Sequence, residues 1–154
     1  MSRSGTGHRA PGPALGAGTR RVLLVVLGVV ALGIGGWAYL TPQAWYESFP
    51  GFGLRWLPVL GPHNQHLSSD IGAFYLGFAT LTLIAAGRPT DTTLVRVTGA
   101  AWLVFNAFHT AYHLRHLDMY SATDNLLNAV SLGAFLLISA ALLLPLRRGS
   151  TTTR

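Results

Sequence analysis

Histidine and aspartate are the residues in this sequence best suited to chemistry, and most of them gather in two short stretches. The stretches read H-N-Q-H-L-S-S-D and H-T-A-Y-H-L-R-H, and they contain His63, His66, Asp70, His109, His113 and His116. Histidines four residues apart on a helix project from adjacent turns, so both imidazoles can bind one metal ion. A carboxylate beside them can supply a further ligand or orient an imidazole through a hydrogen bond.

A site of this composition suits zinc, iron or copper, which accept imidazole nitrogen together with carboxylate oxygen. We name His66, Asp70, His109 and His113 as the primary candidate ligands, with His63 and His116 as secondary ones. Two histidines on facing helices can alternatively hold a haem. The chain has no cysteine, which excludes thiolate metal sites, disulfides and cysteine nucleophiles.

Each of these residues also fits a structural role. His63 and His66 fit a solvated loop. Asp70, like the two serines before it, fits the N-cap of a helix. His109 fits a hydrogen bond to a neighbouring helix. Residue spacing therefore leaves three readings open: a cofactor site, a structural polar network, and a path for protons or a substrate.

The composition is that of a membrane protein. Half of the 154 residues are hydrophobic and only 10% are charged, whereas about 25% is usual in soluble domains. The formal net charge of +6 comes from arginines at the ends of apolar segments, not along one polar face. A nucleic-acid interface is therefore excluded.

Four apolar segments predict an all-α bundle of four transmembrane helices. They cover residues 22–40, 70–86, 94–113 and 126–146. About 20 residues, at roughly 1.5 Å each, cross the hydrocarbon core of a bilayer. Short connections favour an up-and-down bundle. We expect a membrane domain at 21–146, a disordered tail at 1–20 and a basic tail at 147–154.

The connection between the first two spans is longer and rich in proline and aromatic residues. We expect the segment 41–64 to lie on the membrane surface or to tuck between helix ends. Aromatic residues with a polar group favour the membrane interface. The residues predicted to form such a belt are Trp37, Tyr39, Trp45, Tyr46 and Trp56.

Arginine distribution predicts the orientation. All but two of the 11 basic residues flank the termini or the connection between the second and third spans, the exceptions being Arg55 and Arg115. The positive-inside rule then puts both termini in the cytoplasm of a multi-pass inner (plasma) membrane protein. The first span also resembles a signal peptide, but its length and the lack of an A-x-A site favour retention. Both histidine stretches consequently face the extracytoplasmic side.

Helical periodicity predicts that the polar residues of three spans each lie on one face of their helix. The third span carries a polar face of about 80°, formed by Asn106, His109, His113 and His116 and continued by Trp102 and Gly99. The fourth span repeats the pattern with Asp124, Asn128 and Ser131. If the second helix begins near Pro62, then His63, His66 and Asp70 also share a face. We expect the three faces to meet at one point.

The stretch G-P-H-N-Q-H-L-S-S-D-I-G, Gly61–Gly72, resembles a motif of uncharacterised small bacterial membrane proteins with four helices. Those proteins often carry an N-x-H/E-L-type motif at the entry to their second span, and their layout is similar to that of the DoxX-like group. The resemblance implies a bacterial inner-membrane protein and no particular activity. His109 and His113 lie outside the motif, so it implies no role for them.

Three functions remain open at this point. The first is a transition-metal or haem site near the extracytoplasmic face, with redox or hydrolytic chemistry. The second is a non-enzymatic helper or interaction subunit whose polar cluster is structural. A proton-coupled transporter is disfavoured because the cytoplasmic half lacks matching ionisable groups. The expected partners are the lipid bilayer and either another membrane protein or a second copy of the chain.

Overall fold

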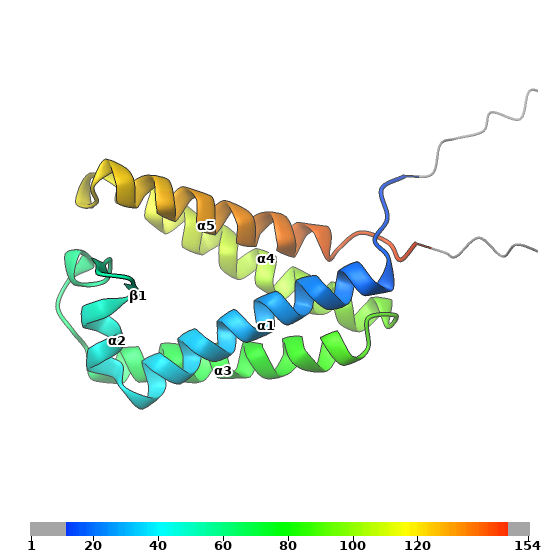
Figure 1. The fold of residues 1–154 in the computed structure, drawn as a ribbon, viewed down its shortest axis with the longest axis horizontal. Coiled ribbons are helices and arrows are strands. Elements are labelled where there is room, and N and C mark those ends of the chain that lie inside the picture. Colours follow the sequence, from blue (N-terminus) through cyan, green and yellow to red (C-terminus); the bar gives the residue numbers. More distant parts are fainter. Residues whose placement is uncertain (1–11, 148–154) are drawn as a thin grey trace, which may run out of the picture.

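The computed structural model describes residues 12–147, and this part of the chain is built almost entirely of helices (Figure 1). The helices are α1 (Ala17–Leu40), α2 (Pro42–Ser48), α3 (Gln65–Gly87), α4 (Thr92–Leu114) and α5 (Ala122–Ala141), with single 3-10 turns at Pro58–Leu60 and Leu117–Met119. A two-residue hairpin pairs β1 (Pro50–Gly51) with β2 (Leu54–Arg55) in antiparallel fashion. The predicted all-α class is confirmed.

Three of the helices are long and apolar enough to cross a membrane, namely α1, α3 and α5. Helix α4 is as long as α3, at 23 residues each. It is less apolar because it carries Arg96, Asn106 and two histidines. Its predicted crossing of the membrane stays a prediction.

Side-chain caps fix where three of the helices begin. The Oδ1 atoms of Asn64 and Asp91 accept the backbone N–H groups of Leu67 and Leu94, each at 3.0 Å. The Ser121 hydroxyl accepts the N–H of Asp124 at 3.1 Å in the same way. Such caps satisfy N–H groups that have no partner within the helix. Because Asn64 is the cap, α3 begins at Gln65, ahead of the predicted residue 70 and after the alternative start near Pro62.

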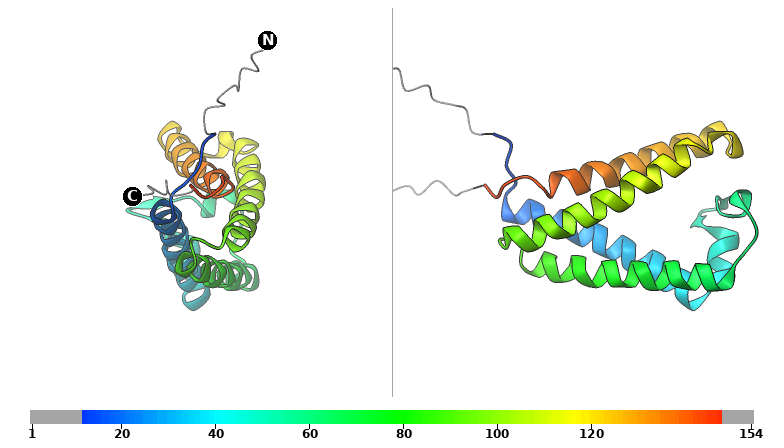
Figure 2. Two further views of the ribbon diagram at one scale, coloured as in Figure 1. Left: turned by 90° about the vertical axis from the view of Figure 1, so that its right-hand side faces the viewer. Right: turned by 180° about the vertical axis from the view of Figure 1, so that it is seen from behind.

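The helices form two pairs. Helix α1 packs closely on α3 and α4 packs on α5, whereas α3 and α4 have few contacts with each other. The two pairs approach each other at the end of the bundle where the described chain begins and ends, which we call the terminal end. They diverge toward the opposite end, which we call the loop end (Figures 1 and 2).

Close approach of α1 and α3 depends on glycine. A Cβ atom on Gly72 would lie 2.5 Å from the backbone N of Tyr39, and one on Gly35 would lie 2.9 Å from the N of Leu76. Both helices can therefore meet backbone to backbone, the mode that small residues allow in membrane helices. Gly77, on the same helix as Gly72, faces open space.

A buried arginine joins the helices at the terminal end. The guanidinium of Arg20 donates to the carbonyl oxygens of Leu144 (2.8 Å) and Pro89 (3.3 Å) and to the Thr92 hydroxyl (3.3 Å). Its side chain is fully buried. Arg20 falls in the predicted disordered tail 1–20, and this boundary was wrong because α1 begins at Ala17. Residues 1–11 of that tail lie outside the described residues.

The C-terminal boundary also differs from the prediction. Helix α5 ends at Ala141, not at residue 146. The chain beyond it pairs with the N-terminal segment, since Leu15 N–H donates to Pro145 O (2.9 Å) and Arg147 N–H donates to Leu15 O (2.8 Å). Of the predicted basic tail 147–154, the structure describes only its first residue.

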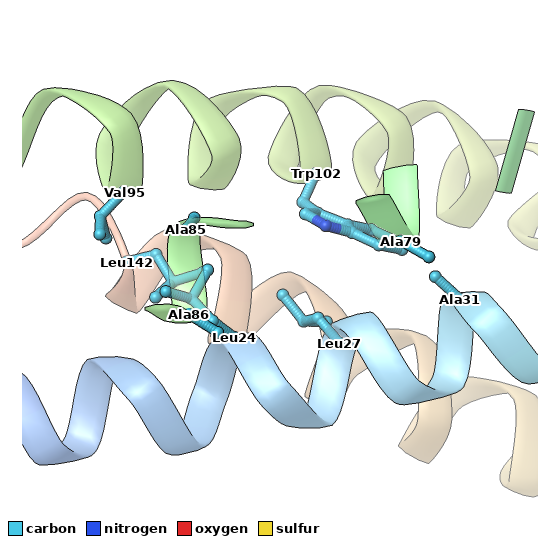
Figure 3. Close-up of a cluster of buried hydrophobic side chains, with 9 residues drawn as sticks. All are labelled: Leu24, Leu27, Ala31, Ala79, Ala85, Ala86, Val95, Trp102 and Leu142. Carbon is cyan, nitrogen blue, oxygen red and sulfur yellow. The ribbon is translucent and has the colours of Figure 1, made fainter. Parts of the chain in front are cut away.

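The main hydrophobic core lies in the terminal half, where all four long helices converge (Figure 3). Its buried members are Leu24, Leu27, Ala31, Ala79, Ala85, Ala86, Val95, Trp102 and Leu142. The indole N–H of Trp102 donates to the Thr82 hydroxyl at 2.8 Å and links α4 to α3. Divergence of the helix pairs beyond this core leaves room at the loop end.

The segment 41–64 tucks into that widening space, one of the two placements expected for it. Trp45 and Trp56 are only 8% and 9% exposed, so these two do not belong to an exposed aromatic belt as predicted. The indole N–H of Trp56 donates to Asp124 Oδ1 at 2.8 Å, and the Tyr120 hydroxyl donates to the Trp56 carbonyl at 3.2 Å. The segment thus connects the α1–α3 side of the opening to α5.

Candidate functional site

A cavity of about 850 Å³ lies at the loop end between the two helix pairs. The segment 41–64 and all four long helices contribute to its wall. Aromatic side chains are prominent there, among them Phe49, Tyr75, Trp102, Phe105 and Phe135. A concave, mostly apolar pocket with a few polar groups is the usual form of a small-molecule site.

Helix α4 presents its predicted polar face to this cavity. Asn106, His109 and His113 all line it. The rings of His109 and His113 lie 4.8 Å apart and nearly perpendicular, at 80°. His109 is also stacked on Phe105 at 5.4 Å. The stripe predicted from helical spacing is confirmed over these three residues.

Asn106 is the deepest of the three and has a structural partner. Its Nδ2 donates to the Ser139 hydroxyl of α5 at 3.0 Å. His116, the fourth predicted member of the face, comes after the end of α4 at Leu114. Its ring stacks on Tyr112 at 4.2 Å, and its Nδ1 lies 2.7 Å from the Tyr112 carbonyl. His116 is therefore separate from the cavity wall.

Helix α5 contributes Asn128 and Ser131 to the wall, as its spacing predicted, whereas Asp124, the third residue of that pattern, does not line the cavity. The Ser131 hydroxyl donates within its own helix, to Leu127 O at 2.9 Å. Asn128 is only 5% exposed, and its Nδ2 has no partner among the described residues. Nδ1 of His113 is likewise buried and unpartnered within that part of the chain. Three residues of the cavity wall, Trp45, His113 and Asn128, thus carry a buried hydrogen-bonding atom that has no partner among the described residues.

The candidate ligands predicted on α3 do not lie where the sequence analysis placed them. His66 and Asp70 pair with each other, with 3.2 Å between Nε2 and Oδ2, and their side chains are 87% and 61% exposed. Neither lines the cavity. His63 precedes the helix, and its ring packs on Tyr46 at 5.1 Å. The predicted common face of these three residues is not formed, because α3 begins at Gln65.

The residues that α3 does turn to the cavity were missed in the sequence. They are Asn64, Leu67, Ser68, Ile71 and Tyr75. Their spacing of three and four residues is that of one helix face. With Asn64 taken as the cap, this periodicity groups the five residues on one face, although it does not say which face of α3 is buried.

Metal binding stays a prediction. Within residues 12–147 no group of three or more histidine, aspartate or glutamate side chains is arranged to hold a metal ion. Of the four primary candidates, His109 and His113 lie together on the cavity wall, and His66 and Asp70 lie together elsewhere. The first pair can offer two imidazole ligands.

The described part of the cavity wall carries no carboxylate, ammonium or guanidinium group. None of the described residues that line it is an arginine, lysine, aspartate or glutamate. Tyr120, in the connection between α4 and α5, is one of its polar groups. Burial, and next the neighbouring Tyr112 and Asp124, raise the pKa of Tyr120 to about 12. Its phenol therefore stays neutral near pH 7.

Comparisons with protein families, with curated proteins and with solved structures found no match. The resemblance of Gly61–Gly72 to small bacterial membrane proteins stays a prediction. We therefore argue function from the geometry of the cavity.

Proposed function

We propose that this chain is a multi-pass membrane protein that binds a small, mainly apolar molecule in the cavity between its two helix pairs. The observation that carries the proposal is an aromatic cavity of about 850 Å³ with unpartnered hydrogen-bonding atoms on its wall. The apolar part of the ligand packs against Tyr75, Trp102 and Phe105, and an oxygen of its polar group accepts a hydrogen bond from Asn128.

Desolvation energetics support this role for Asn128. A buried donor without a partner costs about 1–3 kcal/mol, and a ligand oxygen that accepts the bond recovers that cost. His113 Nδ1 can donate or accept according to its tautomer, so it can pair with the same polar group. Because both residues line the cavity, they would make recognition of a polar group there directional.

The same proposal includes four membrane spans, with α4 added to the three long apolar helices α1, α3 and α5. Both termini are then cytoplasmic. The arginine distribution supports this orientation. All arginines except Arg55 and Arg115 lie near the chain termini or near the connection between α3 and α4. The cavity then lies near the extracytoplasmic face of the bacterial inner membrane, within reach of molecules dissolved in the bilayer.

A transition metal or haem remains a second candidate ligand. Its support is the pair of imidazoles of His109 and His113, on adjacent turns of α4 and 4.8 Å apart. Zinc, iron and copper all accept imidazole ligands. Such a centre would give the protein redox or hydrolytic chemistry, and elemental analysis with a visible spectrum of the purified protein tests for it directly.

A helper or interaction subunit is the non-enzymatic alternative. Its support lies deeper in the bundle, where Asn106 bonds Ser139 and Trp102 bonds Thr82 between helices. Those pairs hold the helices together without any ligand. The unpartnered atoms of His113 and Asn128 are what distinguish a binding cavity from such a network.

Photolabelling with benzophenone tests the proposal. Benzophenone is a neutral aromatic ketone, so it matches both the apolar wall and the Asn128 donor. We expect irradiation in detergent to label cavity residues such as Leu132. Asn128→Leu, of similar size, should lower labelling about fivefold, the effect of one hydrogen bond.

Matched controls separate binding from damage to the fold. His113→Phe should weaken labelling, whereas His66→Phe, the same change on an exposed histidine away from the cavity, should not. Circular dichroism checks that each variant stays helical. Equal labelling of all variants, or labelling confined to membrane-facing residues such as Leu137, would refute the proposal.

A further inference from the structure

A second apolar hollow lies on the outside of the bundle, between α3 and α4. This α3–α4 groove has a volume of about 690 Å³. It is lined by Phe74, Phe78, Ala100, Ala101, Val104, Phe105, Phe108 and His109. All but His109 are apolar, and Phe108 is 76% exposed. In a bilayer such a surface faces acyl chains.

The groove and the cavity share part of their walls. Phe105 and His109 line both. Their stacked rings therefore stand between the interior cavity and the membrane-facing groove. Across this boundary α3 and α4 meet through aromatic rings, with Phe105 at 5.5 Å from Tyr75 and 6.0 Å from Phe74, and beyond these rings the two ribbons diverge toward the loop end (Figure 2). A molecule of the bilayer can approach the cavity at this point without crossing water.

The cavity wall limits the kind of polar group that can enter. It has no lysine or arginine among the described residues, so a phosphate or carboxylate would be desolvated there without a cationic partner. Its free atoms include the Asn128 amide donor, which suits an uncharged oxygen such as a hydroxyl or a carbonyl.

We propose that the ligand is a neutral long-chain lipid that enters sideways from the bilayer between α3 and α4. Its uncharged oxygen-bearing head lies at Asn128 and His113, and its chain leaves the cavity past Phe105 and His109 and lies along the α3–α4 groove. This inference rests on the proposed function and adds the chemical class of the ligand and its route of entry.

The test uses photoreactive hexadecanol in phosphatidylcholine vesicles that contain the full chain. One form of the probe carries a diazirine beside the hydroxyl and the other carries it at the chain end. We expect the first to label Asn128 and Leu132, and the second to label Val104 and Phe108. Excess unlabelled hexadecanol should compete at these sites but not at Leu137, which any membrane lipid can reach.

Substitutions and a charged probe sharpen the result. Ala101→Phe fills the groove and should lower the saturable labelling about tenfold, the effect of excluding two methylene groups from an apolar surface. Ala107→Phe, on the same helix but outside both hollows, is the matched control and should leave it unchanged. The phosphate ester of the same alcohol should not label Asn128.

The possible failures are distinguishable. If benzophenone labels Leu132 but the hexadecanol probes label only residues outside both the cavity and the groove, the proposed function stands and the lipid inference is overturned. Equal labelling of Asn128 by the phosphate ester would also overturn it. So would chain-end labelling confined to the cavity, because the chain would then not use the groove. Loss of benzophenone labelling as well would refute both proposals.

Discussion

Gly72 offers the sharpest test of how α1 and α3 are packed. In Gly72→Ala the new methyl group would lie 2.5 Å from the backbone N of Tyr39 and 2.8 Å from its Cα. Real Cβ atoms do not approach this closely, and backbone atoms cannot rotate away, so the helices must separate. Overpacking of this kind costs about 1–3 kcal/mol, and we expect a loss near 3 kcal/mol in the free energy of unfolding.

Two other glycines calibrate that magnitude. In Gly28→Ala the nearest atom is Leu83 Cδ2 at 2.6 Å, which belongs to a side chain that can change rotamer, so we expect a loss of only about 1 kcal/mol. In Gly77→Ala nothing lies within 4 Å of the new methyl group. Alanine is the better helix former there, and we expect a gain of about 0.5–1 kcal/mol.

Equilibrium unfolding in mild detergent, followed by circular dichroism during titration with sodium dodecyl sulfate, measures the three differences. The expected order of stability is Gly77→Ala, the unaltered chain, Gly28→Ala and then Gly72→Ala. If Gly72→Ala changed stability by less than about 0.5 kcal/mol, the usual range of a surface substitution, then α1 and α3 would not meet as described.

Three further predictions concern other parts of the chain. Arg20→Met removes three hydrogen bonds that link α1 to Thr92 of α4 and to the backbone of Pro89 and Leu144, and it should destabilise the fold by about 3–5 kcal/mol, measured by the same titration. The pKa of Tyr120 is raised from 10.0 to about 12. The stability that this shift contributes is therefore fully present below pH 10.0 and is lost as the pH rises toward about 12. Tyr120→Phe should flatten that part of the pH profile of unfolding. Reporter fusions in the connection 115–121 should read as extracytoplasmic, and a cytoplasmic result would refute the proposed orientation.

Local periodicity was enough to predict the polar faces of α4 and α5. Asn106, His109 and His113 share a helix face whatever their neighbours do, and so do Asn128 and Ser131. Both helices also begin close to where their apolar segments do. Spacing therefore identified which residues of each helix share a face, and in the structure these faces line the cavity.

The face of α3 could not be predicted without its first residue. His66 and Asp70 do share a face, but it is the exposed one, and Ser68 lies on the buried side. On a helix two residues correspond to a rotation of about 200°, so spacing identifies residues on one face without saying which face is buried. Contact with α1 decides that, and such contacts join residues far apart in the chain.

Burial of Trp45 and Trp56 was beyond sequence reasoning for a similar reason. Tryptophan suits a membrane interface and a protein interior equally well, since its ring is apolar and its N–H is polar. For Trp56 the outcome depends on Asp124, which lies 68 residues after it and accepts its indole N–H. No local pattern contains that pairing.

The two helix pairs are joined at the terminal end, so each pair can rotate about that end as a rigid unit. Helix α4 has 23 residues, and at about 1.5 Å per residue it is roughly 35 Å long. A rotation of only about 3° around the Arg20 end would therefore displace its far tip by about 2 Å. Trp102 lies about 15 Å from that end, so the same rotation moves it by less than about 1 Å while the cavity changes width at the loop end. The bond between Trp56 and Asp124 holds the two tips at one separation.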